Sequence, residues 1–158
     1  MEKQRWAIFD LDGTIANIDY RLQQSTVKGK LDYKKLHDPS LIQFDEPMFK
    51  TIDLIKDLRS FNVKIFILTA RFATTEKATV EWLDKHEVYF DELLMKSSKD
   101  VYMKSDKWKE KEMLRFMQQD YSRQVILAAD DYKKNQFMFE SYDIPCLDPW
   151  ESELNTKE

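Results

Sequence analysis

The sequence predicts an α/β protein in which a parallel sheet is covered by helices on both faces. Short apolar segments over residues 6–9, 63–68 and 125–129 each end at polar residues, as buried strands do. Segments with the apolar spacing of helices lie between them. Strands that alternate with helices favour a parallel sheet with both faces covered, and in such sheets ligands bind beyond the carboxyl ends of the strands.

The helices are predicted from the spacing of apolar residues. Met48, Ile52 and Ile55 recur at helical intervals, and Pro47 suits the first turn of that helix, where its missing N–H is harmless. Thr74 or Thr75 is expected to open the next helix. The apolar residues that mark this and two later helices are Ala78, Trp82 and Leu83, then Met113, Phe116 and Met117, then Met138 and Tyr142. Weaker strand candidates lie near residues 89–95 and 144–147.

Length and composition predict a single domain over residues 1–158. A chain of 19.0 kDa with 42% hydrophobic and 34% charged residues is typical of a folded soluble protein that buries a full core. No apolar run approaches the roughly 18 residues of a membrane helix. The first residues lack the apolar centre of a secretory signal, so we expect a cytoplasmic protein with no membrane partner.

The rare residues exclude several classes of function. Gly13 and Gly29 are the only glycines. A P-loop, a dinucleotide-binding loop and a G-x-S-x-G elbow each need closely spaced glycines, and all three are therefore excluded. Cys146 is the only cysteine, which excludes an intrachain disulfide and a cysteine-based zinc site. The net charge of -4 argues against a general nucleic-acid coat but not against recognition of a single phosphorylated end.

Polar residues of types that can take part in catalysis or metal binding follow three of the predicted strands. In chain order they are Asp10 and Asp12, Thr69 and Arg71, and Asp130 and Asp131. Carboxylates that converge repel one another unless a cation lies between them, and an all-oxygen set favours a hard cation such as Mg²⁺. A carboxylate at a strand end can also attack phosphorus and form an aspartyl-phosphate. A second carboxylate nearby can then act as general acid and base.

These motifs resemble those of the haloacid dehalogenase (HAD) superfamily of phosphohydrolases. Residues 9–14 (FDLDGT) resemble its D-x-D-G-T first motif, residues 68–71 (LTAR) its second and residues 129–131 (ADD) its fourth. The resemblance implies a Rossmannoid three-layer sandwich whose core comprises about residues 1–15 and 47–150. A small helical cap or flap would occupy about residues 16–46, and its size favours an open site that admits a macromolecular end.

The resemblance also implies the catalytic and metal-binding roles. Asp10 would be the nucleophile and a Mg²⁺ ligand, and Asp12 the acid and base, with its backbone carbonyl on the metal. Asp130, with Asp131 beside it, would complete the metal site. Residue types alone do not decide which of these last two carboxylates touches the metal.

Four further residues are implied to contact the substrate. Thr69 and Lys109 would hold the transferred phosphoryl group, and Arg21 and Arg71 would bind around it. Lys109 is preferred to Lys107 because, at about 100° per residue, it shares the apolar stripe of its helix, whereas Lys107 points to the other side.

Finer features resemble the 3′-phosphatase domain of phage and bacterial polynucleotide kinases. Arg21 stands eleven residues after the nucleophile, Arg71 stands two after the second-motif hydroxyl, and residues 91–96 and 106–109 also match. Two positions depart from that branch, because Tyr132 replaces an arginine and Ser105 an acidic residue. These 158 residues contain no P-loop, so we expect the kinase half to be absent. The resemblance implies a stand-alone polynucleotide or nucleotide 3′-phosphatase that acts in the cytoplasm. If the protein is encoded by a phage, this is the cytoplasm of the host cell.

Two alternatives stay open. The enzyme could act on a small phosphomonoester or a 5′-nucleotide, or the fold could serve a catalytically idle nucleic-acid-binding protein. The pair Asp10 and Asp12 argues against idleness, because an abandoned site has no need of clustered carboxylates that repel one another. DNA versus RNA, 3′ versus 5′ preference and the oligomeric state are left undecided.

Overall fold

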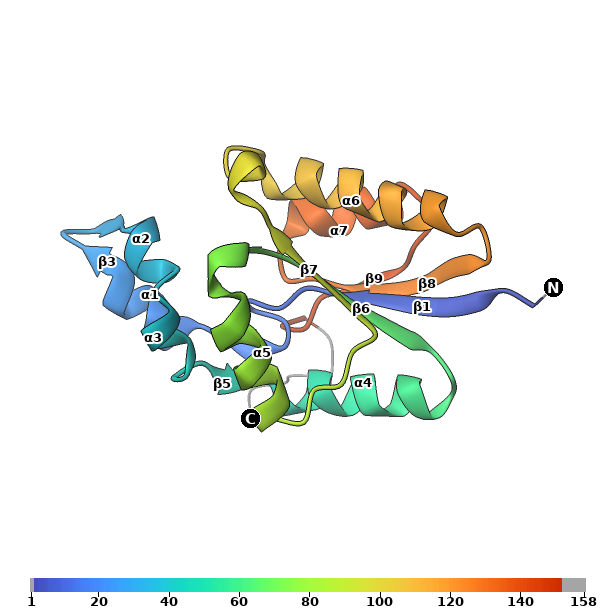
Figure 1. The fold of residues 1–158 in the computed structure, drawn as a ribbon, viewed down its shortest axis with the longest axis horizontal. Coiled ribbons are helices and arrows are strands. Elements are labelled where there is room, and N and C mark those ends of the chain that lie inside the picture. Colours follow the sequence, from blue (N-terminus) through green and yellow to red (C-terminus); the bar gives the residue numbers. More distant parts are fainter. Residues whose placement is uncertain (1, 152–158) are drawn as a thin grey trace.

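The computed structural model describes residues 2–151. Figure 1 shows a central sheet with helices on both of its faces. The sheet has five strands in the order β7-β6-β1-β8-β9, and every neighbouring pair is parallel. Its strands are β1 (Gln4–Phe9), β6 (Lys64–Phe72), β7 (Glu92–Lys96), β8 (Arg123–Ala129) and β9 (Cys146–Leu147). The predicted α/β fold with a parallel sheet is therefore confirmed.

Two helices cover each face of the sheet (Figure 1). They are α4 (Phe49–Ser60) and α5 (Glu76–Lys85) on one face, and α6 (Ser105–Gln119) and α7 (Lys133–Glu140) on the other. Successive side chains of a strand point to opposite faces, so β1 contributes to two cores. Ala7 and Phe9 pack in the core with α4 and α5, while Trp6 and Ile8 pack with α6 and α7.

Pro47 lies before helix α4 rather than in its first turn. Met48 is the N-cap of α4, and Pro47 pairs with Ala16 in a short antiparallel ladder between β2 (Ala16–Asn17) and β5 (Glu46–Pro47). In a two-stranded ladder each strand has one edge without a partner strand, and a residue that lacks an N–H is tolerated there. The predicted helix is present, but it begins two residues later than the proline suggests.

Helix α5 opens at Thr75, as predicted, whereas helix α7 ends earlier than predicted. Thr75 is the N-cap of α5, yet its hydroxyl donates to the carbonyl oxygen of Phe72 at 2.8 Å instead of capping the helix, because residues Ala73–Thr75 form a 3₁₀ turn. Helix α7 ends before Tyr142. The chain turns there through Asp143, whose φ of 59° lies in the left-handed region that stops a helix.

Residues 16–46, which we call the flap, lie beyond the carboxyl ends of β1 and β6 (Figure 1). The flap contains α1 (Asp19–Ser25), α2 (Tyr33–Leu36), α3 (Pro39–Ile42) and a hairpin of β3 (Thr26–Val27) and β4 (Lys30–Leu31). Asp32 and Asp38 cap α2 and α3 by accepting backbone N–H bonds. Among residues 2–151, no helix is both long and apolar enough to cross a membrane.

Candidate active site

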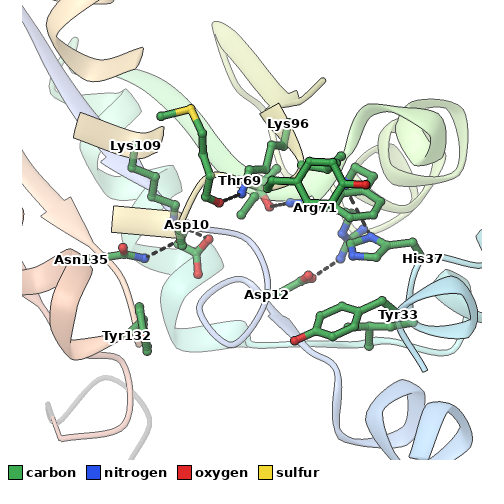
Figure 2. A pocket seen from close by; sticks show the side chains of 17 residues that line it. Asp10, Asp12, Tyr33, His37, Thr69, Arg71, Lys96, Lys109, Tyr132 and Asn135 are labelled. Carbon is green, nitrogen blue, oxygen red and sulfur yellow. Dashed lines mark hydrogen bonds and ion pairs between the residues drawn. The ribbon is translucent and has the colours of Figure 1, made fainter. Parts of the chain in front are cut away.

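The strand ends bring their polar side chains to one pocket of about 660 Å³ (Figure 2). Asp10 and Asp12 follow β1, and Thr69 and Arg71 lie near the carboxyl end of β6. Lys109 reaches the same pocket from the first turns of α6. The remaining wall comes from the flap, the residues after β7 and the start of α7. The pocket therefore lies where a parallel sheet places its ligands.

Two further carboxylates meet Asp10, which lines this pocket. Ligand oxygens of Asp10, Asp130 and Asp131 all lie within 4.8 Å of one another. Lys109 Nζ donates to Asp10 Oδ1 at 2.8 Å and to Asp130 Oδ2 at 2.6 Å, and all three of these side chains are buried. Residues separated by about a hundred positions in sequence thus form one charged cluster, which we call the acidic cluster, with one ammonium for three carboxylates.

The pKa values of the acidic cluster follow from burial and like charge. Burial raises the pKa of Asp10 well above its usual value, and repulsion from Asp130 adds to this, while Lys109 acts in the opposite direction. Burial and Asp130 likewise raise the pKa of Asp131 to about 6. Burial lowers the pKa of Lys109, but Asp10 and Asp130 outweigh it and the net shift is upward. The cluster carries more negative charge than Lys109 neutralises.

This arrangement fits a divalent cation. The donors are carboxylate oxygens, which hard cations such as Mg²⁺ prefer. Gly13 lies against Asp131 with a φ of +80°, and a Cβ at this position would stand 2.1 Å from Asp131 Oδ2. Only glycine combines that backbone conformation with so close an approach. The loop after β1 is therefore built around the position of the Asp131 carboxylate.

Addition of Mg²⁺ is expected to raise the melting temperature of the protein relative to EDTA. A ligand that binds only the folded state stabilises it, by about 2.7 kcal/mol at one hundred times its Kd. Calorimetric melting of wild type, Asp131→Asn and the exposed α4 variant Asp53→Asn measures this. We expect Asp131→Asn to lose most of the shift and Asp53→Asn to keep it. Equal shifts in all three proteins would contradict a metal site at Asp131.

A second charged cluster joins the flap to the sheet. Asp12 Oδ1 accepts from Arg21 Nη2 at 2.9 Å and also from Arg71 Nη2. Asp45, in the flap, accepts from Arg21 Nε at 3.1 Å and from Arg71 Nη2 at 3.2 Å. Both arginines and Asp45 are fully or almost fully buried. We call these four residues the arginine–aspartate cluster; its two positive and two negative charges balance.

The arginine–aspartate cluster fixes the charge of Asp12. Burial raises the pKa of this carboxyl, but Arg71 and Arg21 outweigh it and bring the pKa to about 2. Arg71 lines the pocket, whereas Arg21 lies behind Asp12 and is absent from the pocket wall. The remaining guanidinium nitrogen of Arg21, Nη1, donates to the carbonyl oxygen of Leu36 at 2.7 Å. Its implied contact with substrate stays a prediction.

Thr69 lies at a break in the sheet. The register between β6 and β7 shifts between Thr69 and Phe72, and the Thr69 hydroxyl accepts from the backbone N–H of Arg71 at 3.1 Å. The hydroxyl is therefore held at the pocket, on the side of β6 next to Asp10 (Figure 2). It remains able to donate its own proton to a ligand oxygen.

Asn135 and Asp45 are site residues that sequence reasoning missed. Asn135 Nδ2 donates to both Asp130 oxygens, at 3.2 and 3.1 Å, and so orients that carboxylate. Its position in the first turn of α7, six residues after the end of β8, could have indicated it. No comparable pattern indicated Asp45, because the flap has no apolar periodicity there and the partners of Asp45 are far away in sequence.

The chain matches the family described as HAD superfamily, subfamily IIIB (Acid phosphatase), over residues 1–130. It belongs to this family, whose members are phosphatases. A search of curated proteins found no match.

Solved structures share the fold. One chain of the Pnkp1/Rnl/Hen1 RNA repair complex matches with a TM-score of 0.72 and 21% identity, over 92% of this chain and 42% of that one. The HAD-like hydrolase SP0104 from Streptococcus pneumoniae matches with a TM-score of 0.67 and 16% identity, over 90% and 83%. The class C acid phosphatase from Bacillus anthracis gives 0.63 and 20%, over 85% and 54%. The present chain thus spans less than half the length of the RNA repair protein it matches.

Proposed function

We propose that this protein is a Mg²⁺-dependent phosphomonoesterase that removes the 3′-phosphate from a nucleic-acid end or a nucleotide. The observation that carries the proposal is the surroundings of Asp10. Its carboxylate lies in the pocket, bonded to Lys109 at 2.8 Å, close to Asp130 and Asp131 and two residues before Asp12. This set supplies a nucleophile, an acid and base, and charges that bind phosphate oxygens.

The proposed reaction has two steps on Asp10. In the first, an Asp10 oxygen forms a bond to phosphorus while the bond from phosphorus to the ester oxygen breaks, and Asp12 gives its proton to the departing oxygen. In the second, Asp12 takes a proton from water, whose oxygen attacks phosphorus and releases inorganic phosphate and free Asp10. A divalent cation held by Asp10, Asp130 and Asp131 would neutralise phosphate charge. Lys109 and Thr69 bind oxygens of the transferred phosphoryl group.

Asp12 needs a proton for the first step, although its pKa is about 2 in the free protein. A phosphate that enters the pocket brings negative charge next to this carboxyl and competes for Arg71. Both effects raise the pKa of Asp12. Within residues 2–151, the buried Arg71 Nε has no hydrogen-bond partner, so the ion pairs of Arg71 leave one of its donors unused. Substrate binding thereby prepares Asp12 to act as an acid.

Three observations support a nucleic-acid 3′ end as substrate. Arg21, Arg71 and residues 91–96 and 106–109 resemble the polynucleotide 3′-phosphatase branch. A chain of an RNA repair complex shares the fold over 92% of this sequence. Residues 96–111, which include part of the pocket wall, hold six lysines and three acids, a net charge of +3 that attracts polyanions.

A panel of phosphomonoesters tests the proposed substrate. It comprises a 3′-phosphorylated oligonucleotide, a 5′-phosphorylated oligonucleotide, mononucleotides and p-nitrophenyl phosphate, each with Mg²⁺ or EDTA. We expect the 3′-phosphorylated oligonucleotide to give the highest kcat/KM and EDTA to abolish turnover. Fast turnover of a mononucleotide with none of the 3′-phosphorylated oligonucleotide would overturn the proposed substrate. Binding without turnover of any member would indicate a catalytically idle protein.

A further inference from the structure

Lys96 is a buried lysine that lines the pocket. It is the last residue of β7, and its side chain is 5% exposed. Its Nζ donates to the carbonyl oxygen of Met103 and lies 5.9 Å from the centre of the Trp108 ring. In the part of the chain that the structure describes, no carboxylate forms an ion pair with it.

This sets Lys96 apart from the two other permanent cations of the pocket wall. Arg71 is paired with Asp12 and Asp45, and Lys109 is paired with Asp10 and Asp130. A buried charge without a counter-charge is costly. Burial accordingly lowers the pKa of Lys96, an effect that Asp100 only partly opposes. A lysine ammonium has three N–H donors, and the Met103 carbonyl accepts from one of them.

The position of Lys96 separates it from the nucleophile. The sheet order places β6 between β7 and β1, so the backbones that carry Lys96 and Asp10 are two strand spacings, about 10 Å, apart. In Figure 2, Thr69 lies between the two side chains. This spacing leaves room at Lys96 for a negative group distinct from a phosphate bound at Asp10.

We propose that Lys96 binds a second phosphate of the substrate, carried on the 5′ oxygen of the same nucleoside whose 3′-phosphate is removed. This inference rests on the proposed 3′-phosphatase function and deepens it. The second phosphate is one sugar away from the first. In an oligonucleotide it is the terminal phosphodiester, in a nucleoside 3′,5′-bisphosphate it is a monoester, and a nucleoside 3′-monophosphate lacks it.

Three substrates test the assignment: a nucleoside 3′-monophosphate, the matching 3′,5′-bisphosphate and the 3′-phosphorylated dinucleotide. For wild type, we expect kcat/KM to be about tenfold or more higher for the two that carry the 5′-side phosphate, as for a lost hydrogen bond to a charged group. Lys96→Met is expected to reduce this ratio to near unity, mainly through KM, and Lys96→Arg to preserve it. Comparing the bisphosphate with the dinucleotide also shows whether the second phosphate is preferred as a terminal monoester or as a phosphodiester.

The matched control is Lys64→Met. Lys64 is also a strand lysine whose Nζ lies over a tryptophan ring, 5.4 Å from the centre of Trp6, but it begins β6 at the opposite end of the sheet. This variant should keep the wild-type ratio. Melting curves of each variant verify folding, and if Lys96→Met does not fold, the ratio for wild type in rising salt replaces it, because screening must lower an electrostatic preference.

Two results would overturn the assignment while the proposed function stands. One is equal kcat/KM of wild type for all three substrates. The other is an equal loss in Lys96→Met on all three, which would place Lys96 at the scissile phosphate or in a structural role. If wild type hydrolyses 5′-phosphates but none of the three 3′-phosphates, the proposed function itself fails, and the assignment with it.

Discussion

Asp10→Asn is expected to lower turnover by about a hundredfold or more while leaving the fold intact. The amide cannot form the acyl-phosphate bond that the proposed first step requires. The amide oxygen can still accept a hydrogen bond from Lys109, whose Nζ lies 2.8 Å from Asp10 Oδ1. The hydrogen bonds of the acidic cluster therefore keep their arrangement. Phosphate release under saturating Mg²⁺ and 3′-phosphorylated oligonucleotide measures the effect.

Melting of the same variant separates catalysis from stability. Burial and the neighbouring carboxylates raise the pKa of Asp10, so folding disfavours its charged form. A neutral amide at this position is therefore expected to keep or raise the melting temperature in EDTA. Asp57→Asn, on the exposed side of α4, serves as the control for both measurements. Residual activity above about one hundredth of wild type would remove Asp10 from the role of nucleophile.

Lys109→Met is expected to lower the free energy of unfolding by about 3–5 kcal/mol in EDTA at pH 7, the usual cost of removing one partner of a buried ion pair. Lys109 is the only cation paired with Asp10 and Asp130 among residues 2–151, and both carboxylates are buried. Urea unfolding measures the change. The matched control, Lys107→Met on the exposed side of the same helix, should stay within about 0.5 kcal/mol of wild type.

The pH dependence of this variant has a definite sign. A carboxyl whose pKa is raised in the folded state takes up a proton on folding, so the protein loses stability as the pH rises from the ordinary pKa of the carboxyl to the raised one. The pKa of Asp131 is already about 6 with Lys109 present. We therefore expect the loss of unfolding free energy caused by Lys109→Met to grow as the pH rises through about 6 and to shrink at lower pH. A deficit below about 1 kcal/mol at pH 7 would contradict the proposed balance of charge.

The fold and the centre of the candidate site could be predicted because they depend on one simple rule. Buried strands are recognisable as short apolar runs, and parallel strands end at one edge of the sheet. Asp10, Thr69 and Asp130 each follow such a run, so their convergence needs no knowledge of the loops. Lys109 was reached differently, from the helical stripe it shares with core residues.

The arginine–aspartate cluster was beyond such reasoning. Arg21 could be identified by its offset from Asp10, but not its partners, because these are set by how the flap folds against the sheet. The flap consists of one- and two-turn helices and two-residue strands, which carry little periodic signal. Asp45 was missed for this reason.

Lys96 was missed for a different reason. It directly follows the weak strand predicted near residues 89–95, so the rule that located Asp10 and Asp130 applies to it as well. A lysine at a strand end, however, has two ordinary outcomes, exposure to water or a salt bridge. The sequence does not reveal that Trp108 and the Met103 carbonyl enclose its ammonium without a carboxylate.

The arginine–aspartate cluster has a consequence for how ligands arrive. Two of its ion pairs cross from the flap to the strand ends, Arg21 with Asp12 and Asp45 with Arg71. A swinging motion of residues 16–46 would separate these charges without water to replace them, at several kcal/mol for each unpaired ion. These ion pairs therefore oppose separation of the flap from the strand ends, and we expect the entrance to keep its shape when a ligand arrives.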